Sequence, residues 1–166
     1  FSDSLLKTPE MAAADAYETS ADGKRHRFYI KKHLRWCDGT FITPADFATA
    51  ISRVRNSKTA EAVWLRDMDC LQVKGQTIEI TTRQPNYLIP YWMGLFAFCL
   101  ARASGAGAGR YVVEQNKESE IVLKRNPFYE GTEASAEWIH FTHIQDPQDN
   151  VDAFYRGQVD ATADTA

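Results

Sequence analysis

Three glycines at alternate positions, Gly105, Gly107 and Gly109, are the nearest approach in this sequence to a phosphate-binding loop. Such a loop follows a buried strand and directs backbone N–H groups at the phosphate from the start of a helix. Here no Val- or Ile-rich strand precedes the glycines, and no Lys-Ser/Thr pair follows them. Because alternating glycine disfavours both helix and strand, we interpret the stretch as a boundary between two substructures.

Two histidines, His140 and His143, lie three residues apart in a segment, 138–144, that we expect to be a strand. Side chains at this spacing point to opposite faces of a strand, which disfavours joint metal ligation. We expect one histidine to face solvent and the other to be half-buried. The pair therefore predicts no metal site.

Three aspartates, Asp146, Asp149 and Asp152, form an acidic cluster just after these histidines. Asp146 followed by Pro147 is typical of a helix start, where carboxylates meet the positive end of the helix. Catalysis would also need a base, a nucleophile and an oxyanion donor within reach of one another, and no Ser/His/Asp or Cys/His signature is evident. We predict that the chain is not an enzyme, with no catalytic residue and no cofactor.

The three cysteines, Cys37, Cys70 and Cys99, are odd in number, widely spaced and without a C-x-x-C motif. This pattern indicates neither a zinc site nor a disulfide framework. A Cys70–Cys99 disulfide stays open for an exported protein. Buried free thiols are the alternative that we favour.

The elements that must position these residues are clearest over residues 34–47. Asp38-Gly39 is a turn dipeptide, because glycine accepts the positive φ of a tight reversal. Thr43 is the expected helix N-cap, with Pro44 at the first helical position and Asp46 at the third. The stretch predicts a short strand, a turn and a capped helix.

The helix is expected over 44–56, because apolar residues recur there with helical spacing and place Phe47, Ile51 and Val54 on a buried face. Periodicity and turn signals predict the remaining elements. Before the glycine-rich stretch they are a loop over 1–23, strands at 25–32 and 34–37, a helical turn at 59–66, a hairpin of 72–73 with 77–82, and a buried helix-to-strand segment at 87–100. After it they are a hairpin of 110–114 with 120–124, a strand at 138–144, a helix at 150–156 ending at Gly157, and the start of a strand at 159–162.

The charge balance excludes a nucleic-acid-binding surface, since the net charge is -3 and the pI is about 5.8. One dense basic cluster spans residues 24–33. On a strand its side chains alternate between two faces, so we interpret it as a solvated sheet edge. No run of about eighteen apolar residues predicts a membrane helix.

Several blocks in fixed order carry a family resemblance. They are residues 13–24 leading into 28–30, 36–47 (WCDGTFITPADF), 107–111 (GAGRY), 121–129 (IVLKRNPFY) and 154–160 (FYRGQVD). The chain resembles the family 5 solute-binding proteins, the oligopeptide-, dipeptide- and nickel-binding components of ABC importers. Cys37 and Arg110 depart from the residues usual in that family, so neither is assigned a ligand role. The connection after Leu100 is also shorter than the family's.

The resemblance implies a mixed α/β, partial class II periplasmic-binding-protein fold. Residues 1–104 would form the small extra subdomain of the family, and residues 105–166 would form the first part of the larger ligand-binding lobe. By the same resemblance, the chain is an N-terminal portion. The second lobe, which closes over the ligand, is expected beyond Ala166.

The resemblance also implies a receptor for a small molecule or, by preference, a peptide, which it delivers to an ABC permease after hinge closure. The protein would be a periplasmic or extracellular monomer that binds no nucleic acid, with a membrane anchor left open. A different reading is the ligand-sensing domain of a cytoplasmic transcriptional regulator.

Ligand-contacting positions carried over from the family are Val63, Trp64, Thr162 and Asp164. Small-molecule sites combine aromatic surface with a few aimed polar groups, which suits these residue types. Trp64 could instead be a core residue. Thr162 and Asp164 could be ordinary strand and loop residues.

Overall fold

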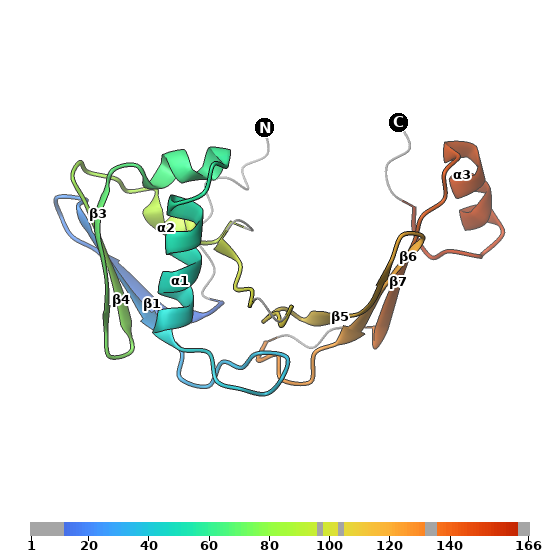
Figure 1. Ribbon diagram of the computed structural model, residues 1–166, viewed down its shortest axis with the longest axis horizontal. Helices are drawn as coiled ribbons and strands as arrows, with labels where there is room; N and C mark the ends of the chain where they lie inside the picture. The colour runs from blue at the N-terminus through green and yellow to red at the C-terminus, as the bar shows by residue number, and fades with distance from the viewer. Residues whose placement is uncertain (1–11, 96–97, 103–104, 132–135, 163–166) are drawn as a thin grey trace. The chain divides into compact units, whose positions relative to one another are not determined.

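The computed structural model describes residues 12–95, 98–102, 105–131 and 136–162. Its secondary structure is mixed α/β (Figure 1). The chain divides into two compact units, one of residues 1–109 and 127–133 and the other of residues 110–126 and 134–166. The assignment of residues 1–104 and 105–166 to a small subdomain and a larger lobe stays a prediction.

The first unit contains a four-stranded antiparallel sheet in the order β1-β2-β4-β3. Its strands are β1 (Ala14–Thr19), β2 (Arg25–Ile30), β3 (Met68–Lys74) and β4 (Thr77–Thr82). Ile78 and Ile80 share one face of β4 and are both buried. The core of this unit consists of Ile30, Ile51, Val54, Leu65, Met68, Ile78, Ile80, Ile89 and Phe98. Each fully buried side chain of this kind contributes about 1.5–3 kcal/mol through the hydrophobic effect.

The prediction of a loop over residues 1–23 is wrong at β1, because Ala14–Thr19 pairs with β2. β1 alternates only weakly between apolar and polar residues, so its pairing depends on the neighbouring strand rather than on its own pattern. This pairing places β2 inside the sheet. The basic cluster is therefore not at a sheet edge, and that prediction is also wrong.

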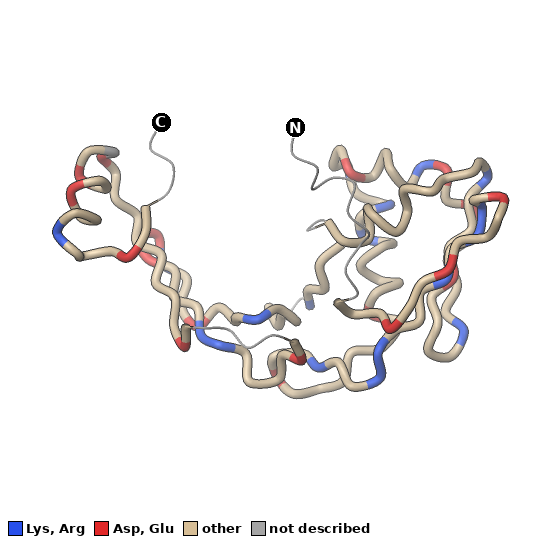
Figure 2. The backbone as a smooth tube through the Cα atoms, turned by 180° about the vertical axis from the view of Figure 1, so that it is seen from behind, with Lys and Arg blue, Asp and Glu red and all other residues tan. Residues whose placement is uncertain are grey.

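His26 shows the consequence of this interior position. Its side chain is buried in β2, and its Nδ1 lies 3.0 Å from Thr19 Oγ1 on the neighbouring strand. Burial lowers the pKa of His26, while the Gly23 carbonyl and the Asp22 carboxylate oppose this shift more weakly. Elsewhere, basic and acidic residues are interspersed along the chain, which agrees with the small net charge (Figure 2).

Helix α1 (Pro44–Arg55) begins and ends close to the predicted bounds and packs against β3 and β4. Ile51 and Val54 are buried as expected, together with Ala50. Phe47 was also expected to be buried, but it is half-buried. Its ring packs against the core on one side and also borders two cavities in this unit.

The start of α1 has the predicted cap at Thr43. The Asp46 carboxylate accepts hydrogen bonds from the Thr43 backbone N–H and from its hydroxyl, both at 2.7 Å. Thr43→Ala removes the second bond, and we expect it to lower the free energy of unfolding by about 0.5–2 kcal/mol. Urea denaturation followed by tryptophan fluorescence measures this loss.

Thr49→Ala is the matched control, because Thr49 lies in the same helix with its hydroxyl bonded to the Ala45 carbonyl at 2.9 Å. Alanine has the higher helix propensity, so this change should be neutral or slightly stabilising. Equal stability of Thr43→Ala and the parent would remove the capping role.

The remaining segments of the first unit depart from prediction where strands were expected. Residues 34–37 form no strand, and a single bridge joins Arg35 to Phe41, because the chain reverses too soon for a longer ladder. Residues 60–65 form a 3₁₀ helix, η2 (Ala60–Leu65), within the predicted helical turn. Among the described residues of the segment 87–100, Ile89–Trp92 form the short helix α2, and both Tyr87 and Leu88 are exposed.

The second unit has a three-stranded antiparallel sheet in the order β5-β6-β7. Its strands are β5 (Tyr111–Lys117), β6 (Glu120–Arg125) and β7 (Trp138–Thr142), as the hairpin and strand predictions required. Helix α3 (Pro147–Tyr155) follows and begins three residues before the predicted helix of 150–156, directly after its cap at Asp146. Gly157 ends it with a φ of 68° and an N–H bond to the Phe154 carbonyl, which confirms the predicted C′ glycine. Residues 159–162 form no strand, since a strand needs a hydrogen-bonded neighbour.

Candidate functional site

A cavity of about 240 Å³ lies within the first unit, and we call it cavity A. Most of its wall is apolar or aromatic, and Arg35 and Glu130 supply its two charged side chains. The cavity is lined by Ala12, Ala13, Leu34, Arg35, Ile42, Phe47, Phe98, Cys99, Leu100, Ala108, Gly109, Phe128, Tyr129 and Glu130. A concave apolar surface with a few polar groups is the usual form of a small-molecule site.

The turn at Asp38-Gly39 positions the Arg35 side of cavity A. The Trp36 N–H donates to the Thr40 carbonyl at 2.9 Å, and the Gly39 N–H donates to the Trp36 carbonyl at 2.9 Å. Arg35 Nη1 donates to the Gly39 carbonyl at 2.7 Å. Its guanidinium also lies 4.0 Å from the centre of the Phe41 ring. These contacts hold Arg35 in one orientation without neutralising its charge.

Gly39 connects the turn to the aromatic wall. Its φ of 82° belongs to the left-handed region, as the turn dipeptide predicted. A Cβ atom at this position would lie 3.0 Å from Cζ of Phe128. Glycine is therefore needed both for the turn and for the close approach of the Phe128 ring.

Arg102 ties the turn to the segment that follows the core. Its Nη1 donates to Asp38 Oδ2 at 3.2 Å and to Thr40 Oγ1 at 2.8 Å. The same guanidinium lies 4.3 Å from the centre of the buried Trp36 ring. Hydrogen bonds from the Thr40 side chain and backbone, and then the charge of Arg102, hold the pKa of Asp38 below its usual value. Asp38 is thus an ionised anchor of the turn.

Cavity A can hold a solute that carries both charges. A carboxylate suits Arg35, whose planar guanidinium offers several N–H donors, and an ammonium group suits Glu130. The apolar wall would take the uncharged part of such a solute. Such a solute would be held by complementarity of charge.

The residues of cavity A were not among the ligand-contact candidates chosen from the sequence. Phe128 and Tyr129 belong to the block 121–129 quoted above. The aromatic pair after Asn126-Pro127 was the one local pattern that could have indicated a ligand-binding surface there. The proximity of residues 128–130 to residue 35 depends on a contact between segments about ninety residues apart, which no local pattern reveals.

The predicted ligand residues lie outside cavity A. Val63 is 56% exposed in η2, while Trp64 is half-buried and stacks on Trp92 with ring centroids 5.9 Å apart. Trp64 packs against the core, in line with the alternative noted above. Thr162 is exposed in the second unit, and Asp164 lies outside the described residues. The ligand role of all four stays a prediction.

Of the other residues considered for chemistry, Cys99 and Gly109 line cavity A. His140 and His143 are both exposed, so the expectation that one is half-buried is wrong. His140 lies on a face of β7 whose residues are all exposed, and His143 lies beyond the end of that strand. His140 Nδ1 lies 3.2 Å from Glu120 Oε1. Asp146 caps α3 by accepting the Gln148 N–H at 2.7 Å, as predicted. All three cysteines are free thiols, but the expectation that they are buried is wrong, because Cys37 and Cys70 are half-buried and Cys99 is exposed.

Comparison with known proteins identifies a family. The model for bacterial extracellular solute-binding proteins, family 5, matches residues 8–166. A search of curated proteins finds no match. Within the described part of the chain, no helix has the length and apolar character needed to cross a membrane.

Solved structures of periplasmic binding proteins share this fold. One is AgaA from A. tumefacien R10 with agropinic acid, at 21% identity and a TM-score of 0.82, covering 89% of this chain and 33% of that one. Another is NikA from Brucella suis with Fe(III)-EDTA, at 21% identity and a TM-score of 0.81, with the same coverage. The pheromone receptor PrgZ matches at 18% identity and a TM-score of 0.80, over 94% of this chain and 38% of that one. The fold is thus the predicted mixed α/β fold of these proteins, and the chain spans about a third of their length.

Proposed function

This chain belongs to the bacterial extracellular solute-binding proteins of family 5, and from that membership we propose that it is part of the solute receptor of an ABC import system. The observation that carries the proposal is the family match over residues 8–166. The receptor would bind its solute outside the cytoplasm and deliver it to a membrane permease. The comparisons give the transcriptional-regulator alternative no support.

The proposed mechanism is closure of two lobes around the solute. Similar structures are about three times as long as this chain, so we propose that residues 1–166 supply one wall of the site and that a further lobe supplies the other. Val63, Trp64, Thr162 and Asp164 remain proposed contacts of the closed form. The receptor is proposed to act as a monomer and to bind no nucleic acid.

For the solute itself we propose a short peptide. Cavity A supports this choice, because Arg35 and Glu130 offer partners of opposite sign to the two termini of a zwitterion. The apolar wall around Phe128 would take its side chains.

Calorimetry with di- to pentapeptides tests the two-lobe mechanism. Loss of half of the roughly 8 kcal/mol behind micromolar affinity leaves binding near millimolar. Residues 1–166 alone should therefore show no saturable binding below about 100 μM, whereas the product of the complete open reading frame should bind at about 1 μM or better. Tight peptide binding by residues 1–166 alone would contradict the proposal.

A variant of Glu130 tests the role of cavity A in the complete gene product. Glu130→Gln should weaken binding of a peptide with a free N-terminus by about tenfold, the loss of one charge-assisted hydrogen bond. The affinity for the N-acetylated peptide should stay the same in both proteins. Equal losses for the two peptides would show that Glu130 does not contact the N-terminus.

A further inference from the structure

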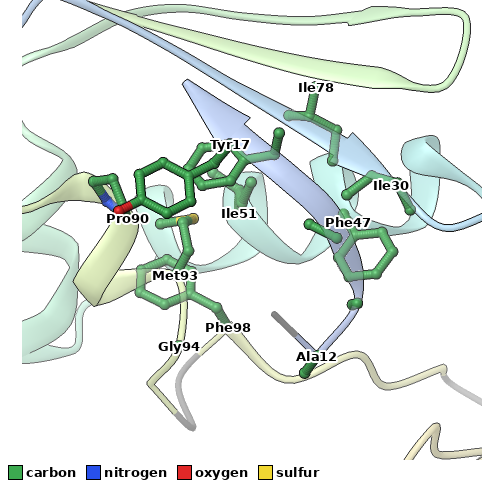
Figure 3. Close-up of a pocket in the computed structure, with 13 residues that line it drawn as sticks. Ala12, Tyr17, Ile30, Phe47, Ile51, Ile78, Pro90, Met93, Gly94 and Phe98 are labelled. Atoms are coloured by element: carbon green, nitrogen blue, oxygen red, sulfur yellow. The ribbon is translucent and has the colours of Figure 1, made fainter. Parts of the chain in front are cut away.

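A second cavity, cavity B, lies in the first unit beside cavity A. Its volume is about 180 Å³. It is a partly open cavity, lined by residues of strands β1, β2 and β4, helices α1 and α2 and the residues that precede β1 and follow α2 (Figure 3). Ala12, Ala13, Phe47 and Phe98 line both cavities.

The lining of cavity B differs in chemistry from that of cavity A. All thirteen residues that line it are apolar or aromatic, and none carries a charge. Tyr17 and Phe28 stack on one another with ring centroids 6.2 Å apart. Figure 3 shows Tyr17, Phe47, Met93 and Phe98 around the space. A charged or strongly polar solute would lose its hydration here without gaining a partner.

The size and lining of cavity B select one class of ligand. An apolar protein cavity of about 150 Å³ is large enough to take up benzene. Aromatic rings bind well against other ring edges and against a methionine thioether, which Met93 supplies here. The walls come from several elements of the folded core, so the cavity is present before any ligand arrives.

We propose that cavity B is a binding site for one small uncharged ring compound, of the size of benzene or indole. The site recognises its ligand by burial and ring contacts, whereas cavity A recognises charge. It does not depend on the proposed transport function, because it lies entirely within one unit of this chain.

The test uses the 166-residue chain with its methionine methyl groups labelled with ¹³C. Met93 lines cavity B, whereas the core residue Met68 does not line it and serves as an internal reference. Titration with indole should shift the Met93 methyl resonance saturably, with a dissociation constant between about 10 μM and 1 mM. The shift of Met68 should be smaller. A Met93 resonance that does not shift saturably up to about 5 mM indole would overturn the proposal.

Two comparisons make the test specific. Ala14→Phe places a ring in the cavity and should weaken indole binding at least about tenfold, whereas Val73→Phe adds the same ring at an exposed position of β3 and should leave it unchanged. Unaltered binding by a folded Ala14→Phe chain would overturn the proposal.

The second comparison needs no variant. Benzene should compete with indole, and benzoate should do so at least about tenfold less well, because its carboxylate finds no partner in the lining. Equal competition by benzene and benzoate would also overturn the proposal. These measurements do not involve peptide binding. A negative result would therefore overturn the proposal for cavity B without bearing on the proposed receptor function.

Discussion

Gly39→Val is expected to lower the free energy of unfolding of the first unit by about 2–6 kcal/mol. Two costs combine in this variant. A β-branched residue at a φ of 82° carries about 1–3 kcal/mol of backbone strain. The new side chain also meets the Phe128 ring, since even its Cβ would lie 3.0 Å from Cζ, and such overpacking costs about 1–3 kcal/mol. Urea denaturation followed by tryptophan fluorescence reports the loss, because Trp36, Trp64 and Trp92 belong to this unit.

Gly75→Val is the matched control for this variant. Gly75 also has a positive φ, of 57°, but no atom lies within 4 Å of a Cβ built there. It should therefore lose only the strain, about 1–3 kcal/mol. An equal decrease in the free energy of unfolding at both positions would show that the Phe128 ring moves aside without cost. Its contact with Gly39 would then not constrain cavity A.

Glu79→Gln is expected to lower the free energy of unfolding by about 2 kcal/mol at pH 7. The Glu79 carboxylate is largely buried in β4, where Oε2 accepts from Arg27 Nε at 2.8 Å and Oε1 accepts from Lys74 Nζ at 2.9 Å. Hydrogen bonds that involve a charged group each contribute about 1.5–3 kcal/mol. The amide of glutamine has one oxygen, so it can accept only one of these two hydrogen bonds. Its NH₂ group, a donor, would then face the other cation.

The same carboxylate predicts how stability depends on pH. Hydrogen bonds from Arg27 and then from Lys74 lower the pKa of Glu79 from 4.5 to about 2. Between these values the unfolded chain binds more protons than the folded chain, so the stabilisation is complete above about pH 4.5 and is lost as the pH falls toward about 2. The difference in free energy between the parent and Glu79→Gln should therefore shrink over this interval.

Asp69→Asn controls for the removal of a carboxylate as such. Asp69 lies on β3 of the same sheet with an exposed side chain, so its replacement should change the free energy of unfolding by less than about 0.5 kcal/mol. A difference between the parent and Glu79→Gln that stays constant from pH 7 to pH 2 would refute the ionised network.

Prediction from sequence succeeded where neighbouring residues decide the structure. The turn at Gly39, the cap at Thr43, the start of α3 at Asp146 and its end at Gly157 all depend on side chains that satisfy backbone groups within a few residues. The strands of the two hairpins were also predictable, because alternation and a glycine turn lie within one short stretch.

Prediction failed where the partner is distant in the chain. β1 is a strand because β2 pairs with it, and His26 is buried because that pairing places β2 inside the sheet. Phe47 has the helical spacing of a core residue, yet it borders two cavities whose other walls come from segments up to about eighty residues away.

The sequence by itself thus determined the family, the mixed α/β class and the positions of the locally encoded turns and helices. The tertiary structure decided which side chains meet, and so it alone brought Phe128, Tyr129 and Glu130 to Arg35 and separated a charged cavity from an apolar one. The physical reason is the range of the interactions. Capping and turn formation act over a few residues and leave a readable pattern, whereas burial and ion pairing act between any segments that the packed core brings together.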